Sequence, residues 1–260
     1  MASKQDIHRV KGVDINVVEA GEGNPTVLFL HYWGGSSRTW GPTIETLSKT
    51  NRSIAIDFRG WGESSKDSDD YSLQTLASDV IELIDQLGVN DFVIVGHSMG
   101  GKVAQIVAAR QPEGLKGLVL FGPAPPTPMT VPEEVRKSYL GLYDTREGVE
   151  AVIGNLTPHT LPDSYREQII EDGLKGAWRA KREWPERGMI EDISASTPKI
   201  NVPVHIIAGG DDAVEPEASL RENFKSIPGV TFTVIPGVGH IAPLEKPVEL
   251  AKAIRAALAV

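Results

Sequence analysis

The chain has 260 residues, of which 40% are hydrophobic and 23% charged, and its net charge is −9. This is typical of a single globular α/β domain, and the negative charge disfavours nucleic acids and anionic membranes as partners. Cysteine is absent, which excludes disulfides, thiolate metal sites and a cysteine nucleophile. The sequence shows no N-terminal signal sequence and no apolar run long enough for a membrane span, so we expect a cytoplasmic protein.

The first half of the chain alternates short β-branched runs with longer helical patterns. Residues 7–11 and 13–20 predict an antiparallel hairpin. The apolar residues of 73–87 recur with a period near 3.6, which predicts an amphipathic helix. Near-continuous apolar runs, typical of parallel strands covered on both faces, predict strands at residues 26–31, 53–58, 91–96 and 115–121.

The second half returns to the same alternation after an interruption. Strands are predicted at 202–208 and 230–235, and helices at 102–110 and 247–258. Strands that alternate with helices in this way form right-handed crossovers and a mostly parallel sheet flanked by helices.

One stretch, residues 126–198, contains no convincing strand. It is charged, helix-prone and interrupted by proline and glycine. We expect a helical lid inserted between two parts of the core, residues 1–125 and 199–260, rather than a helical excursion away from the site. Trp178 and Trp184 lie within this stretch and are candidates for lining a pocket.

A Gly-x-Ser-x-Gly motif lies at the junction of a predicted strand and a predicted helix, and its residues are Gly96-His97-Ser98-Met99-Gly100. A nucleophilic serine on such a sharp turn needs small residues at both flanking positions, and the N–H of Met99 can point at a developing oxyanion. A simple helix-capping serine is the ordinary alternative. Residues 96–102 also fit the start of a phosphate-binding loop, but Val103 stands where that motif requires Ser or Thr.

A serine nucleophile needs a base and an orienting acid. Of the six histidines, His240 follows the last predicted strand, at the carboxyl end where parallel sheets place their sites. Asp211 and Asp212 follow another predicted strand, and from their position alone either is a candidate for the acid. The chain order of serine, aspartate and histidine is the order of α/β-hydrolases.

These motifs, taken together, resemble the α/β-hydrolase superfamily over nearly the full chain, and in particular its small bacterial esterase and haloperoxidase-like branch. The resemblance implies an eight-stranded sheet with the lid after strand six. It favours Asp212 as the acid, because the family's acid stands four residues before a proline, here Pro216. The further matching features are His31 with Gly34 and Gly35, the segment 57–64, and Gly239 before His240.

The resemblance also assigns the second oxyanion N–H to Trp33. The chain departs from the family at Tyr32, where glycine is usual, so Tyr32 is expected to narrow this loop and to border the substrate. Ser98 argues against dehalogenases and epoxide hydrolases, which place an aspartate at this turn.

The expected function is hydrolysis of carboxylic esters or lactones through an acyl-enzyme, with a small-molecule substrate and neither cofactor nor metal. A cofactor-free perhydrolase or haloperoxidase would use the same residues with peroxide as the acceptor. A ligand-binding protein that kept the fold without turnover is the alternative from another class. Acyl specificity and oligomeric state are left open by the sequence.

Overall fold

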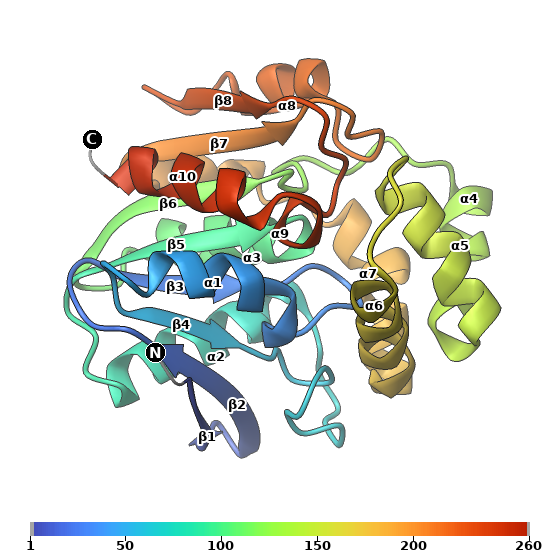
Figure 1. Cartoon of the computed structure of the whole chain (residues 1–260), viewed down its shortest axis with the longest axis horizontal. Helices are drawn as coiled ribbons and strands as arrows, with labels where there is room; N and C mark the ends of the chain where they lie inside the picture. The colour runs from blue at the N-terminus through green and yellow to red at the C-terminus, as the bar shows by residue number, and fades with distance from the viewer. Residues whose placement is uncertain (1–2, 259–260) are drawn as a thin grey trace.

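A computed structural model describes residues 3–258 as a central eight-stranded sheet with helices on both faces (Figure 1). The strand order is β1-β2-β4-β3-β5-β6-β7-β8, and every neighbouring pair is parallel except β1 with β2 and β2 with β4. The predicted α/β-hydrolase fold is confirmed. The strands are β1 Lys4–Val10, β2 Val13–Ala20, β3 Thr26–Leu30, β4 Ser53–Ile56, β5 Phe92–His97, β6 Leu115–Phe121, β7 Val204–Gly209 and β8 Thr231–Ile235.

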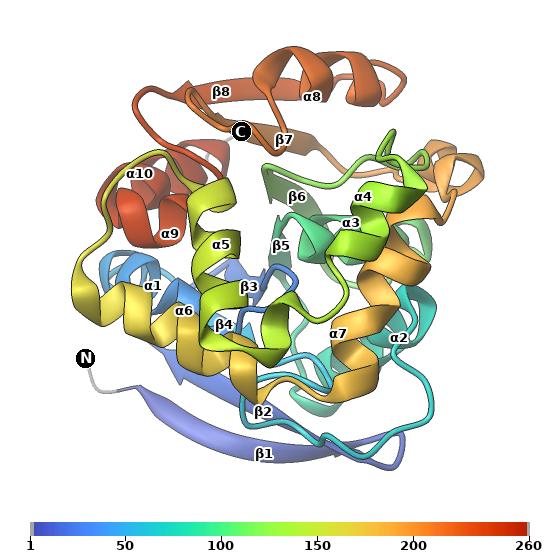
Figure 2. The same ribbon diagram turned by 90° about the vertical axis from the view of Figure 1, so that its right-hand side faces the viewer.

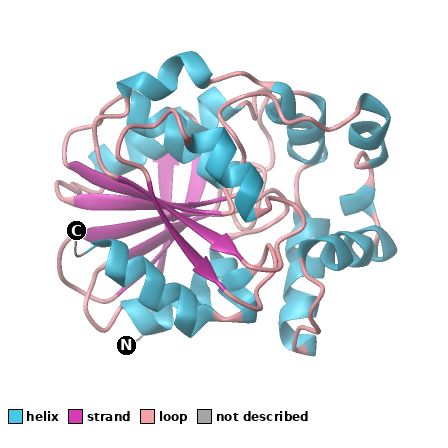
Figure 3. Ribbon diagram, turned by 90° about the horizontal axis from the view of Figure 1, so that it is seen from above, coloured by secondary structure: helices cyan, strands magenta, loops and turns pink. Residues whose placement is uncertain are grey.

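The two faces of the sheet are covered by different sets of helices, which Figure 3 shows as cyan layers around the magenta strands. Alternation along each strand divides the core: Val93 of β5 packs toward α1 and α10, whereas Ile94 packs toward α2, α3 and α8. The flanking helices are α1 Gly41–Leu47, α2 Leu73–Gln86, α3 Met99–Ala109, α8 Glu217–Phe224, α9 Ala242–Glu245 and α10 Pro247–Leu258.

The segment between β6 and β7 is helical, and its helices lie beyond the carboxyl ends of the parallel strands (Figures 1 and 2). Its two ends are tied together, because Met129 N–H donates to the carbonyl of Met189 and Ile193 N–H to that of Pro126. We call residues 126–198 the helical insertion. Its helices are α4 Glu133–Ser138, α5 Arg146–Leu156, α6 Asp163–Lys175 and α7 Trp178–Glu186.

The predicted helix at 102–110 begins three residues earlier, at Met99. Gly100 and Gly101 have low helix propensity, so the sequence pattern concealed this first turn. The early start matters because it places the positive end of α3 directly behind Ser98. Within residues 3–258, none of the helices is long and apolar enough to cross a membrane.

Candidate active site

Ser98 occupies a strained turn between β5 and α3. Its backbone angles are φ 52° and ψ −118°, a conformation that side-chain-bearing residues rarely adopt. A Cβ on Gly100 would lie 2.5 Å from the carbonyl oxygen of His31, and one on Gly96 would lie 2.7 Å from that of Gly100. The two glycines therefore allow strand, turn and helix to approach closely while the serine faces outward.

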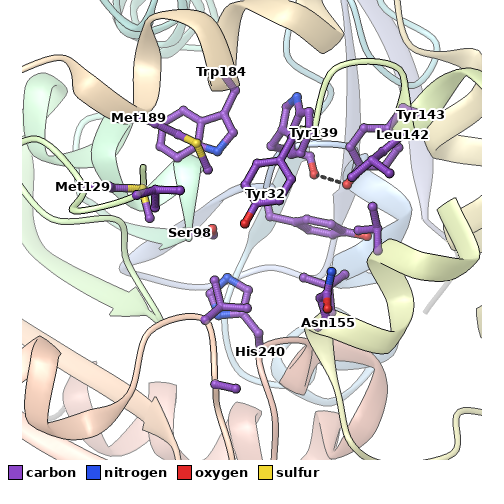
Figure 4. Close-up of a pocket in the computed structure, with 16 residues that line it drawn as sticks. Tyr32, Ser98, Met129, Tyr139, Leu142, Tyr143, Asn155, Trp184, Met189 and His240 are labelled. Atoms are coloured by element: carbon purple, nitrogen blue, oxygen red, sulfur yellow. Dashed lines mark hydrogen bonds between the residues drawn. The ribbon is translucent and has the colours of Figure 1, made fainter. Parts of the chain in front are cut away.

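His240 and Asp212 form a buried pair. His240 Nδ1 lies 2.7 Å from Asp212 Oδ2, and the two residues are 1% and 5% exposed. Because a carboxylate only accepts hydrogen bonds, Nδ1 carries a proton, and in the neutral ring Nε2 then presents a lone pair. Nε2 has no hydrogen bond within residues 3–258, and His240 borders the same cavity as Ser98 (Figure 4).

The electrostatics of Asp212 favour a carboxylate. Burial by itself would raise its pKa, but the His240 ring and the N–H groups of Glu215 and Val214 outweigh burial and lower the pKa. Those two N–H groups lie 2.9 and 2.8 Å from Oδ1. An ionised acid in this position holds the His240 ring in one orientation and one tautomer.

Asp211 points away from this pair. It is exposed, and its Oδ2 lies 3.0 Å from Nε2 of His159 in the helical insertion. The structure thus separates the two neighbouring aspartates: Asp212 contacts His240, and Asp211 contacts the insertion.

Two further histidines brace the loops around the site. His31 Nδ1–H donates to the carbonyl of Tyr32 at 2.7 Å, and its Nε2 accepts the N–H of Phe58 at 3.0 Å. Burial lowers the pKa of His31 to about 4, which fits this neutral state. His97 Nε2–H donates to the carbonyl of His240 at 2.7 Å and so fixes the loop that carries the base.

The loop after β3 is also held by the insertion. Tyr143 Oη donates to the carbonyl of Trp33 at 2.8 Å (Figure 4). The indole N–H of Trp33 donates to the carbonyl of Lys181 at 3.0 Å. The rings of Trp33 and Tyr143 meet edge to face, with centroids 4.5 Å apart. Met99, the other predicted oxyanion donor, is the first residue of α3, and the first N–H groups of a helix have no acceptor within it.

A cavity of about 410 Å³ opens over Ser98. Tyr32 and Trp184 border it, as the sequence suggested. Most of its wall comes from the helical insertion, and apart from Trp184 no sequence pattern distinguished those residues from ordinary packing. The lining residues are Tyr32, Trp33, Ser98, Met129, Val131, Tyr139, Leu142, Tyr143, Val152, Asn155, Leu156, Trp184, Met189, Ala213, Val214 and His240.

The prediction that Trp178 borders the pocket is wrong. Trp178 is 61% exposed, and the guanidinium of Arg182 stacks 4.5 Å from its ring. Trp184 lies six residues further along α7 and is 4% exposed. At about 100° per residue, this spacing turns the two tryptophans to different sides of the helix.

Lys102, the residue that suggested a phosphate-binding loop, is fully buried. Its Nζ donates to the carbonyls of Glu191 at 2.6 Å and of Thr127 at 3.4 Å, at the two ends of the insertion. The lysine is thus occupied in anchoring the insertion, which agrees with Val103 in disfavouring a phosphate-binding loop. Within residues 3–258, no group of three or more His, Asp or Glu side chains is placed to hold a metal ion.

Comparisons with known proteins agree with this architecture. The profile of the alpha/beta hydrolase family matches residues 27–253. A 2-(acetamidomethylene)succinate hydrolase of Mesorhizobium japonicum is 28% identical, with 98% of this chain and 94% of that protein covered. A non-heme chloroperoxidase of Kitasatospora aureofaciens is also 28% identical, with 88% and 89% covered.

Solved structures show the same fold. A bromoperoxidase from Bacillus anthracis superposes with a TM-score of 0.90 at 23% identity, covering 99% of this chain and 100% of that one. An esterase from Exiguobacterium antarcticum gives 0.91 at 20% identity, with the same coverage.

Proposed function

The chain belongs to the alpha/beta hydrolase family, and from this premise we propose that it is a serine hydrolase that cleaves carboxylic esters or lactones. One observation carries the proposal. The buried pair of Asp212 and His240 leaves Nε2 of the histidine unpaired beside the cavity that exposes Ser98. A base held in one tautomer next to a serine on a strained turn is the arrangement that acyl transfer requires.

In the proposed mechanism, Ser98 Oγ attacks the carbonyl carbon while His240 Nε2 takes the hydroxyl proton. The tetrahedral oxyanion is bound by the N–H groups of Met99 and Trp33. His240 then returns the proton to the alcohol oxygen as the carbon–oxygen bond breaks, which leaves an acyl group on Ser98. Water, deprotonated by His240, releases the acid and restores the serine.

The helical insertion has the place of a lid in this proposal. Its residues form most of the cavity wall, and Tyr143 and Lys181 bind the loop that carries the proposed oxyanion donor Trp33. A lid of this kind excludes water from the acyl-enzyme and determines which acyl groups fit.

A second candidate activity is perhydrolysis. Two of the similar proteins are named as a non-heme chloroperoxidase and a bromoperoxidase. In this reaction the same acyl-enzyme would be attacked by hydrogen peroxide instead of water and would release a peracid. The two proposals therefore differ only in the second step, in which either water or hydrogen peroxide attacks the acyl-enzyme.

The test is labelling with a fluorophosphonate probe followed by a panel of nitrophenyl esters and lactones, with and without hydrogen peroxide. We expect labelling at Ser98 and turnover in water. Peracid formation faster than hydrolysis would favour the second candidate. A protein that neither labels nor turns over any substrate would be a binding protein and would contradict both.

A further inference from the structure

Among residues 3–258, no lysine, arginine, aspartate or glutamate lines the cavity over Ser98. From this we infer that the enzyme is selective for substrates with an uncharged, largely apolar acyl group and discriminates strongly against acyl groups that carry a carboxylate. The inference rests on the proposed function and specifies its substrate class.

The composition of the wall is the first support. Figure 4 shows Met129, Met189 and Trp184 gathered on one side of Ser98, with Leu142 and Tyr143 on the other. Thioether, indole and aliphatic groups bind apolar surface and offer no charge. The polar groups that the wall adds are neutral, such as the amide of Asn155 and the hydroxyl of Tyr139.

Three cations in or beside the insertion are held by backbone carbonyls away from the cavity. Arg136 donates to the carbonyl of Pro185 at 2.9 Å, and Lys181 to that of Tyr143 at 2.7 Å. Lys102 is fully buried against the carbonyls of Glu191 and Thr127. None of these three cations borders the cavity, so a carboxylate bound there would lose its hydration without gaining a counterion.

The negative charge around the cavity also disfavours an acyl group that carries a carboxylate. Asp212, whose lowered pKa keeps it ionised, lies directly behind His240, and the chain as a whole carries −9. The acyl group is the part of the substrate that these features select, because it stays bonded to Ser98 Oγ after the alcohol has left. A charged acyl group would remain in the cavity through both halves of the reaction.

Three matched substrates test the inference: the p-nitrophenyl esters of hexanoic acid, of adipic acid with a free distal carboxylate, and of adipic acid with that carboxylate methylated. We expect kcat/KM for the free adipate to be about 100-fold or more below that of its methyl ester. The methyl ester should stay within about 10-fold of the hexanoate, which shows that length is tolerated. Rates within about 3-fold for the free and methylated adipates would overturn the inference.

A charge placed in the wall gives an independent test. Val131 is half-buried and borders the cavity ahead of α4. Val131→Lys should reduce the discrimination between free and methylated adipate by about 10-fold or more, because it supplies the missing counterion. Val131→Gln, of comparable length without the charge, should leave the discrimination unchanged; if the two variants behave alike, missing charge is not the cause.

The outcomes distinguish a failure of this inference from a failure of the proposed function. A protein that labels with fluorophosphonate and hydrolyses all three esters equally retains the proposed function and loses only this inference. A protein that neither labels nor hydrolyses any of them loses both.

Discussion

Asp212 Oδ2 lies 2.7 Å from His240 Nδ1, whereas the adjacent Asp211 is turned toward the insertion and bonds to His159. The two aspartates therefore provide a matched pair of variants. Asp212→Asn should lower kcat/KM by about 10⁴-fold, because an amide favours the wrong imidazole tautomer.

Asp211→Asn is the control for that measurement and should stay within a few-fold of the parent. It changes the same functional group one residue away and disturbs only an exposed contact. Steady-state kinetics of the two variants on one nitrophenyl ester show which aspartate is the acid. A larger loss of kcat/KM in Asp211→Asn than in Asp212→Asn would mean that Asp211 is the acid.

Ser98 provides a test of backbone strain as well as of chemistry. Ser98→Ala should abolish probe labelling and ester hydrolysis with little change in the free energy of unfolding, because alanine has the same strain at φ 52°. Ser98→Gly should be equally inactive yet more stable than Ser98→Ala by about 1 kcal/mol. Glycine relieves the backbone strain of the folded state, but its greater conformational freedom in the unfolded chain offsets part of that gain. Urea denaturation measures the difference, and equal stabilities would show that the turn is relaxed.

Tyr143 is expected to act by positioning the loop that carries Trp33. Removing its hydroxyl in Tyr143→Phe breaks the 2.8 Å hydrogen bond to the Trp33 carbonyl. We expect kcat to fall about 10-fold with a smaller change in KM, because a misplaced oxyanion donor weakens the transition state more than the bound substrate.

The matched control is Tyr139→Phe. Tyr139 borders the same cavity, but the Trp33 carbonyl is held by Tyr143 and not by Tyr139. Affinity for a trifluoromethyl ketone, which forms a tetrahedral adduct with serine, should weaken in Tyr143→Phe in parallel with kcat and stay nearly unchanged in the control. Equal losses in both variants would assign Tyr143 a purely structural role.

The raised pKa of Glu215 predicts how the free energy of unfolding depends on pH. Burial and the neighbouring Asp212 carboxylate raise the pKa of Glu215 to about 8, from an ordinary value of 4.5, although Lys102 opposes the shift. Between these two values the folded state holds a proton that the unfolded state has released, so the stabilisation from this group falls as pH rises, by up to about 1.4 kcal/mol per pH unit.

Glu215→Gln removes this dependence because the amide does not titrate. Compared with the parent, the variant should gain stability progressively between pH 5 and pH 8, and the difference should shrink toward pH 4. Thermal unfolding across that range measures it, with Glu222→Gln, an exposed change on helix α8, which begins two residues after Glu215, as the control. A constant difference between variant and parent at every pH would contradict the buried, protonated Glu215.

Local patterns in the sequence determined the sheet and the position of the serine. Strand and helix periodicity reports which residues face the core, so the segments at 115–121 and 247–258 were predicted with the bounds that the structure has. The Gly-x-Ser-x-Gly spacing determined the turn at Ser98, because close approach of neighbouring backbone requires glycines there. These features depend on residues close together in the chain.

Only the tertiary structure decided what surrounds the serine. Trp33 and Tyr143, which share a hydrogen bond, are 110 positions apart, and nothing in the local pattern of either residue indicates the other. Trp178 and Trp184 were equivalent candidates in the sequence, and the rotation of α7 separates them. The uncharged wall of the cavity arises in the same way, since it depends on which carbonyls the lysines and arginines of neighbouring segments reach, and packing fixes those contacts.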